Sequence, residues 1–134
     1  MMKNFLITIF SVLSISLFLV ACKKEENNGG NGKDGNITVS VSYKQSTNPT
    51  FVYSYGETEI RLFRDGMKVA TMYANPSNQN VNFGTYEYGN YRVDAFVTKT
   101  KYNSSNGATN TYDRSKTESF KLDTGNKSVS ISFK

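Results

Sequence analysis

The feature that most restricts the fold is a period of two in the placement of apolar side chains. Residues 37–43 alternate aliphatic or aromatic side chains with threonine and serine, and residues 129–133 alternate them with serine. Successive side chains of a β-strand point to opposite faces, so this pattern predicts strands with one buried face. Because no helical period of useful length follows residue 22, the chain is predicted to be all-β.

The strongest local signal is the dipeptide Asp65-Gly66, which lies between two alternating segments, residues 58–64 and 67–73. Asp-Gly favours the two-residue hairpin turn in which both residues take positive φ. Pairing outward from this turn in strict register places Leu62 opposite Val69. The side chains predicted on the buried face are Ile60, Leu62, Val69, Thr71 and Tyr73, and those predicted on the other face are Phe63, Ala70 and Met72.

The remaining segments predict further short strands separated by turns. Strands are expected around residues 81–83, 91–97, 120–122 and 129–133, with turns or loops at residues 44–50, 74–79 and 100–113. The last two strands are expected to pair as an antiparallel hairpin, which would order the C-terminus. About seven strands with turns at regular intervals predict a single antiparallel β-sandwich over residues 37–134.

Two resemblances refine this fold. Residues 86–91 (Tyr-Glu-Tyr-Gly-Asn-Tyr) resemble the tyrosine corner of immunoglobulin-like and fibronectin-like sandwiches, which implies that the Tyr91 hydroxyl bonds to the backbone upstream. The Asp-Gly hairpin, followed by Phe83-Gly84 and then by residues 89–93 (Gly-Asn-Tyr-Arg-Val), resembles transthyretin-like or carboxypeptidase-regulatory-like modules. That resemblance implies a fold and an accessory role rather than an activity, because fold alone does not set function.

The first 21 residues have the composition of a cleavable export signal. Lys3 precedes an apolar run over residues 5–20, slightly shorter than the roughly 20 residues that a membrane span needs. The run ends in Leu-Val-Ala-Cys, which resembles a bacterial lipobox. In that family the thiol receives diacylglycerol, cleavage precedes the cysteine, and the new amine is usually acylated. Cys22, the only cysteine, is therefore the expected lipid attachment site, with an uncleaved anchor helix as the alternative.

Residues 22–36 are expected to be a lipidated cysteine and a flexible linker. Lys-Lys-Glu-Glu is followed by a stretch rich in asparagine and glycine, with almost nothing apolar to bury. The charged cluster after the cysteine resembles the surface-export tag of Bacteroidota lipoproteins, and a solvated linker facing the periplasm is the alternative. The expected location is the cell envelope, anchored in the outer membrane, with exposure at the cell surface if the charged cluster acts as such a tag.

The composition offers little for catalysis. The chain has no histidine, which removes the commonest general base and the commonest metal ligand at neutral pH. It also has no Gly-x-Ser-x-Gly elbow, phosphate-cradling glycine motif or EF-hand-like loop, although a calcium site built across loops stays open. Glu57 and Glu59 stand two apart, as a glycosidase pair could, but a solvated strand edge is the simpler explanation. The prediction is a non-enzymatic protein without metal or cofactor.

The residues most suited to binding are aromatic. Four tyrosines stand among serine, asparagine and threonine in or beside expected loops, namely Tyr53, Tyr55, Tyr102 and Tyr112. Rigid amphipathic rings with polar neighbours make many loop paratopes and also stack on sugars, so a protein or glycan ligand is expected. The alternative is that these rings cap the ends of the core. A second candidate patch is the outer stripe of Phe63, Met72 and Phe96, unless residues 44–56 or 100–113 cover it.

The net charge and the strand edge at residues 128–133 limit the classes of function that the chain can have. The formal net charge is +5 with the basic residues mostly spread singly, so the chain contains no nucleic-acid-binding tract. The leading hypothesis is a non-enzymatic, membrane-anchored sandwich that presents a binding or accessory module on the cell envelope. The alternative is a structural or assembly subunit of a surface complex or filament, with the edge at residues 128–133 accepting a strand by β-augmentation.

Overall fold

The computed structural model describes residues 32–134, which form eight strands. The expected signal peptide, the Cys22 lipid site and most of the expected linker lie outside the described residues. The strands are β1 (Asp34–Tyr43), β2 (Phe51–Tyr55), β3 (Thr58–Arg64), β4 (Met67–Ala74), β5 (Asn80–Glu87), β6 (Gly89–Asn103), β7 (Thr109–Leu122) and β8 (Asn126–Phe133). Among residues 32–134 there is no helix long and apolar enough to cross a membrane.

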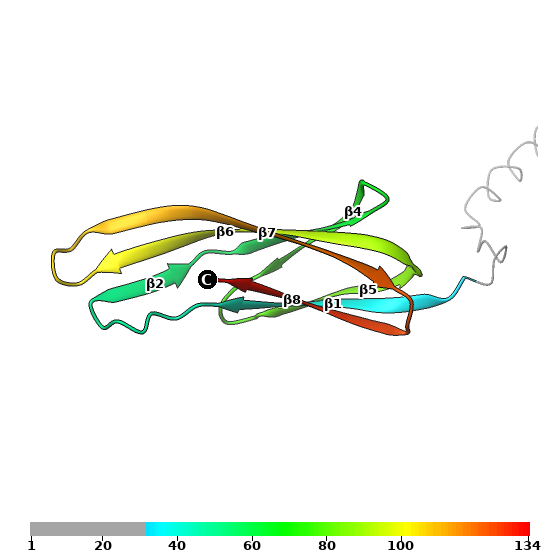
Figure 1. Ribbon diagram of the computed structural model, residues 1–134, viewed down its shortest axis with the longest axis horizontal. Coiled ribbons are helices and arrows are strands. Elements are labelled where there is room, and N and C mark those ends of the chain that lie inside the picture. The colour runs from blue at the N-terminus through cyan, green and yellow to red at the C-terminus, as the bar shows by residue number, and fades with distance from the viewer. Residues whose placement is uncertain (1–31) are drawn as a thin grey trace, which may run out of the picture. The chain divides into compact units, whose positions relative to one another are not determined.

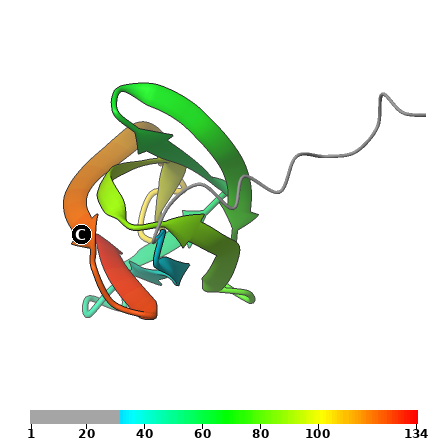
Figure 2. The same cartoon turned by 90° about the vertical axis from the view of Figure 1, so that its right-hand side faces the viewer.

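The strands form two facing sheets (Figure 1). The three-stranded sheet has the order β5-β1-β8, and the five-stranded sheet contains β2, β6, β3 and β4, with β7 paired to β6. Seen along the long axis, β7 lies beside β8 and β4 lies beside β5, so the two sheets approach each other at both edges (Figure 2). The predicted all-β fold is confirmed in a sandwich-like arrangement, with eight strands rather than seven.

Alternate side chains of both sheets meet in a core between the layers. The inward residues of β1 and β8 pack against those of β3 and β6, and the predicted buried faces of residues 37–43, 91–97 and 129–133 are confirmed. Fully burying one such aliphatic or aromatic side chain contributes about 1.5–3 kcal/mol. The largest fully buried side chains include Phe133, Ile37, Ile60, Leu62, Leu122 and Ile131.

The C-terminal strand does not pair as predicted. β8 lies parallel to β1 over the whole of its length, and β7 pairs with β6 instead. The turn at residues 123–125 carries the chain from the five-stranded to the three-stranded sheet, so β7 and β8 cannot form a hairpin. The arrangement is therefore mixed rather than wholly antiparallel. The C-terminus is ordered as expected, and β8 lies at an edge of its sheet, beside β7 of the other sheet.

The Asp65-Gly66 hairpin is confirmed, but its predicted register is wrong. Asp65 and Gly66 have φ of 49° and 81°, as the two-residue turn demands. Beyond the turn the register shifts, so that Leu62 pairs with Ala70 and Val69 is left as an extra residue. Such a β-bulge locally reverses which side chains face inward.

The bulge changes the composition of both faces of β4. Ala70 and Met72 pack toward the core, whereas Val69 and Tyr73 are exposed, the reverse of the prediction. Strict alternation would have directed the Thr71 hydroxyl inward, and burying an unpaired hydroxyl is unfavourable. The bulge instead directs an unbroken set of apolar side chains inward, which ends with the fully buried Ala74.

Two strands include segments for which no strand was predicted: β2 follows the predicted loop at residues 44–50, and β7 begins inside the predicted loop at residues 100–113. β7 follows β6 through a tight turn in which the Gly107 amide donates to the Asn103 carbonyl over 2.8 Å. All side chains from residue 109 to residue 119 are exposed, so β7 has no apolar period to reveal it. β2 does carry such a signal, because Phe51, Tyr53 and Tyr55 alternate with exposed residues.

The fold also begins earlier than the predicted linker boundary. β1 starts at Asp34, and residues 34–36 pair with the end of β5. Gly35 is buried against the Thr124 carbonyl, where a Cβ atom would clash. The last part of the expected linker therefore belongs to the sandwich.

The predicted hydrogen bond of Tyr91 is confirmed. Its hydroxyl donates to the Glu87 carbonyl over 2.7 Å and ties the start of β6 to the end of β5. The ring is buried and stacks on Phe120 with centroids 5.8 Å apart. Burial raises the pKa of the Tyr91 hydroxyl, which favours the neutral donor form.

The bulge predicts that Val69 can be removed without disturbing the core. Its deletion should leave Leu62 paired with Ala70 in a regular ladder and should lower the free energy of unfolding by less than about 1 kcal/mol. Urea denaturation followed by circular dichroism measures this. Deleting Arg61 is the control, because β3 pairs on both edges and a slip there inverts its faces. Equal destabilisation by both deletions would contradict the assigned register.

The Tyr91 corner predicts the effect of Tyr91→Phe. Loss of the hydroxyl should lower the free energy of unfolding by about 0.5–1.5 kcal/mol at neutral pH. The raised pKa means that the native state keeps a proton that the unfolded state loses above about pH 10, so wild-type stability falls there. The variant should show a smaller alkaline loss in urea melts at pH 7 and pH 11. An unchanged midpoint at pH 7 would argue that the hydrogen bond does not stabilise the fold.

Candidate functional site

The four tyrosines predicted to bind ligand all lie on strands rather than in loops. Tyr53 and Tyr55 lie on β2, Tyr102 lies on β6, and Tyr112 lies on β7. All four belong to the end of the five-stranded sheet where β6 and β7 continue past the three-stranded sheet (Figure 1). Tyr102 and Tyr112 fall in the loop predicted at residues 100–113, and that prediction is wrong there because β6 extends to Asn103 and β7 begins at Thr109.

Strand register brings three of these tyrosines to one face. Lys99 of β6 pairs with Tyr55 on one side and with Tyr112 on the other, and Lys101 pairs with Tyr53. Directly paired residues project from the same face of a sheet. This face is the inner one, because Lys99 continues the series of inward residues on β6.

Tyr102 projects from the opposite face. It pairs with Val52 of β2, and both side chains are exposed, Tyr102 to 43%. Tyr112 has nearly the same exposure, 41%, on the inner face. The predicted set is thus divided into a cluster of three and one residue that cannot act with them.

The inner cluster combines rings with cations. The Lys99 ammonium lies 3.9 Å from the ring centroid of Tyr53 and 5.7 Å from that of Tyr55. The Lys101 ammonium lies 3.8 Å from the Phe51 centroid, and the Arg114 guanidinium lies 5.6 Å from that of Tyr112. Cations over aromatic faces are attracted by the ring quadrupole. We call this set the cationic aromatic face, which consists of Phe51, Tyr53, Tyr55, Lys99, Lys101, Tyr112 and Arg114.

Lys99 stands out because it is charged and buried. Only 7% of its surface is exposed, and within residues 32–134 its ammonium has no hydrogen bond or ion pair to an acidic side chain. Burial lowers the pKa of Lys99, and three neighbouring cations lower it further. In order of effect these are Arg114, Lys44 and Lys101.

The core fixes the rings of this face from behind. The Tyr55 hydroxyl donates to the Lys44 carbonyl over 2.9 Å, and its ring contacts Tyr43 with centroids 5.0 Å apart. Tyr43 is buried and shares a 2.7 Å hydrogen bond with Thr58. Tyr55 is therefore held in place by the sandwich itself, which favours a preformed binding surface.

The outer stripe predicted from Phe63, Met72 and Phe96 is only partly correct. The bulge turns Met72 toward the core, while Phe63 and Phe96 remain on the outer face. Neither predicted loop covers them. Instead the Arg92 guanidinium lies 4.3 Å from the Phe63 centroid, and that of Arg61 lies 4.7 Å from the Phe96 centroid.

The outer arginines are paired with carboxylates. Arg92 Nε lies 3.0 Å from an Asp94 oxygen, and Arg61 forms an ion pair with Glu59. The hydrogen bond from Arg61 lowers the pKa of Glu59, the opposite of what the acid of a glycosidase requires. Both of these outer arginines therefore have a carboxylate beside them, whereas the ion pairs of residues 32–134 include neither Lys99 nor Lys101.

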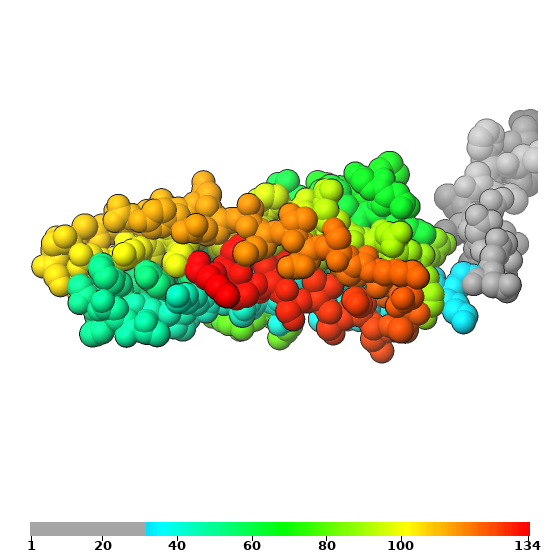
Figure 3. Space-filling model, in the orientation of Figure 1, coloured from blue at the N-terminus to red at the C-terminus, as the bar shows by residue number. Residues whose placement is uncertain are grey.

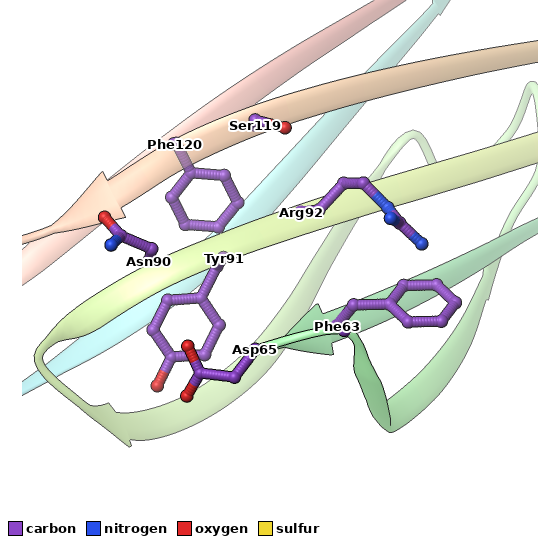
Figure 4. Close-up of a pocket in the computed structure, with 8 residues that line it drawn as sticks. Phe63, Asp65, Asn90, Tyr91, Arg92, Ser119 and Phe120 are labelled. Carbon is purple, nitrogen blue, oxygen red and sulfur yellow. The ribbon is translucent and has the colours of Figure 1, made fainter.

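Two open depressions also mark the surface. One of about 510 Å³ lies beside the Asp65-Gly66 turn, and its lining includes Tyr91, Arg92 and Phe120 (Figure 4). Its Tyr91 hydroxyl and Arg92 guanidinium are already occupied by Glu87 and Asp94.

The other depression, of about 420 Å³, contains Glu57, Glu59 and Asp113. The Asp113 carboxylate accepts a hydrogen bond from Thr98 over 3.0 Å, and Glu59 is paired with Arg61. No group of three or more histidine, cysteine or acidic residues within residues 32–134 is arranged to hold a metal ion. Tyr91 and Arg92 in the first depression, and Glu59 and Asp113 in the second, are therefore engaged by neighbouring groups.

Comparison with protein-family models, with curated proteins and with solved structures found no match for this chain. The resemblances to lipoproteins and to transthyretin-like modules therefore rest on the residues that carry them. Three of the four tyrosines named from the sequence belong to the cationic aromatic face. The sequence patterns did not indicate Phe51, Lys99, Lys101 or Arg114, although the alternation of three aromatic residues over Phe51–Tyr55 was an available signal.

Proposed function

We propose that this chain is a non-enzymatic, lipid-anchored protein of the cell envelope, and that its sandwich is an accessory module that binds a glycan through the cationic aromatic face. The observation that carries the proposal is the position of that face. The described chain enters the sandwich at Asp34, at one end, and β2 and the β6–β7 turn lie at the other end (Figure 1). A module anchored through its N-terminus would thus present the face away from the anchor.

The chemistry of the face supports a glycan. Phe51, Tyr53 and Tyr55 line one strand with half-buried rings, and amphipathic rings of this kind stack on sugars. In the depression that contains Glu57, Glu59 is paired with Arg61 and Asp113 accepts a hydrogen bond from Thr98, so neither of these two carboxylates is free to act as a general acid or base. The two facing sheets and the Asp65-Gly66 hairpin support the resemblance to transthyretin-like accessory modules, and the Tyr91 hydrogen bond supports the resemblance to the tyrosine corner of immunoglobulin-like sandwiches.

The lipid anchor is supported by the lipobox-like segment that ends at Cys22. Eleven positions, residues 23–33, separate Cys22 from the first strand, and a fully extended chain of that length spans at most roughly 36–40 Å. Two or more acyl chains hold a protein stably at a membrane, whereas one holds it only marginally. The anchor would therefore keep the sandwich close to the membrane surface.

Replacing Cys22 should separate anchoring from folding. Cys22→Ser should shift the protein from the membrane fraction to the soluble fraction in cell fractionation, because no acyl chain can be attached. The released protein should unfold at the same temperature as the anchored form, since the core lies within residues 34–133. A variant that stays in the membrane fraction would refute the lipid anchor.

The binding role predicts different effects for two equally exposed tyrosines. The full chain in nonionic detergent should be retarded in affinity gels that contain at least one of dextran, galactomannan, polygalacturonate or dextran sulfate. Tyr112→Ala should weaken that retardation about three- to tenfold, because an aromatic contact is lost. Tyr102→Ala, at 43% exposure on the opposite face, is the matched control and should behave as wild type.

Two outcomes would overturn the glycan-binding role. One is the absence of retardation in all four gels. The other is an equal loss in both variants, which would show that binding does not use the inner face.

A further inference from the structure

The cationic aromatic face has a repeat along its strands. Tyr55 pairs with Lys99, and two residues further along each strand Tyr53 pairs with Lys101. Two residues along a strand span roughly 7 Å, so the face presents two successive pairs of one ring and one cation at that spacing. A surface with a repeat suits a ligand with a repeat, that is, a polymer of ring-shaped units.

The cations of this repeat have no acidic partner within residues 32–134, unlike those of the outer face. Arg61 pairs with Glu59 and Arg92 pairs with Asp94, whereas the ion pairs of the described chain include neither Lys99 nor Lys101. As a residue Lys99 is only 7% exposed, and its ammonium lies over the Tyr53 ring rather than beside a carboxylate. Burial and the nearby cations Arg114, Lys44 and Lys101 lower the pKa of Lys99, and an anion placed there would reduce the repulsion among these cations.

We propose that the cationic aromatic face binds an acidic polysaccharide, whose carboxylate or sulfate groups pair with Lys99 and Lys101 while its sugar rings lie against Tyr53 and Tyr55. This inference rests on the proposed function and specifies its ligand. An anionic group would neutralise the cluster and supply the charge-assisted hydrogen bonds that the Lys99 ammonium lacks within residues 32–134. The spacing of the two lysines sets the spacing of the charged groups that fit.

The burial of Lys99 distinguishes this ligand from a membrane surface. Phosphates of a bilayer lie in a plane and attract exposed basic side chains. The ammonium of Lys99, a residue with 7% exposure, lies beside the rings of Tyr53 and Tyr55, where a flexible chain can insert a charged group. The aromatic series on β2 favours sugar rings over an acidic peptide, whose charges lack a flat apolar face.

The test compares Lys99→Met with Lys68→Met in the full chain. Lys68 is exposed on β4, remote from the face, so both variants lose the same charge. In affinity gels with polygalacturonate or dextran sulfate, Lys99→Met should bind at least tenfold more weakly, because a charge-assisted contact is lost. Lys68→Met should change binding less than twofold. The two gels separate carboxylate from sulfate recognition, and dextran is the neutral counterpart of dextran sulfate.

Thermal unfolding controls for folding of the variants. Removing a buried, unpaired charge should leave the Tm of Lys99→Met no lower than that of wild type. Lys101→Gln, at a half-buried position, provides a second variant that should weaken binding to the same acidic polymers.

Three results would overturn the inference. If dextran alone retards the protein and Tyr112→Ala still weakens that retardation, the ligand is not acidic, while the proposed glycan-binding function stands. If Lys99→Met and Lys68→Met weaken binding of the acidic polysaccharides equally, the effect comes from net charge alone. If polyglutamate binds as strongly as the acidic polysaccharides, sugar rings are not required. Absence of retardation in any gel would overturn the proposed function as well.

Discussion

The structure depends on the pairing and alternation of β6. This strand of 15 residues pairs with β7 along one edge and with β3 and then β2 along the other. Its inward residues are Tyr91, Val93, Ala95 and Val97 as far as the core extends, and then Lys99 and Lys101. One alternating series therefore builds the core and, where the opposing sheet ends, the proposed binding face.

The two faces of the five-stranded sheet differ in whether their cations have carboxylate partners. Outward, each arginine that lies over a phenylalanine also has a carboxylate beside it. The inner cationic aromatic face belongs to the end of the molecule where β2 and the turn between β6 and β7 lie together (Figure 3). Inward, the lysines lie over aromatic rings without a carboxylate among the described residues. Ring faces attract the cations but leave their charge uncompensated, so an anionic ligand would complete the inner face.

Local patterns were reliable where one segment or one turn decides the outcome. The Asp65-Gly66 turn needs positive φ at both residues, and the Tyr91 hydroxyl reaches a carbonyl only four residues upstream. Both could be predicted because the partners are close in sequence. The first part of β7 could not be predicted in this way. It is an edge strand whose side chains are exposed on both faces from residue 109 to residue 119, so it needs no apolar residues. The bulge at Val69 was also not predicted, because it depends on which side chains of β4 can pack in the core.

The sequence by itself determined the all-β class, the buried faces of β1, β6 and β8, and the hairpin between β3 and β4, because a period of two and a turn dipeptide act locally. Only the tertiary structure decided that β8 runs parallel to β1, and that Tyr53, Tyr55 and Tyr112 share a face while Tyr102 does not. These outcomes depend on which strands become neighbours and in what register. Residues far apart in the chain are brought together by packing between sheets, and packing is optimised over the whole core rather than within a segment.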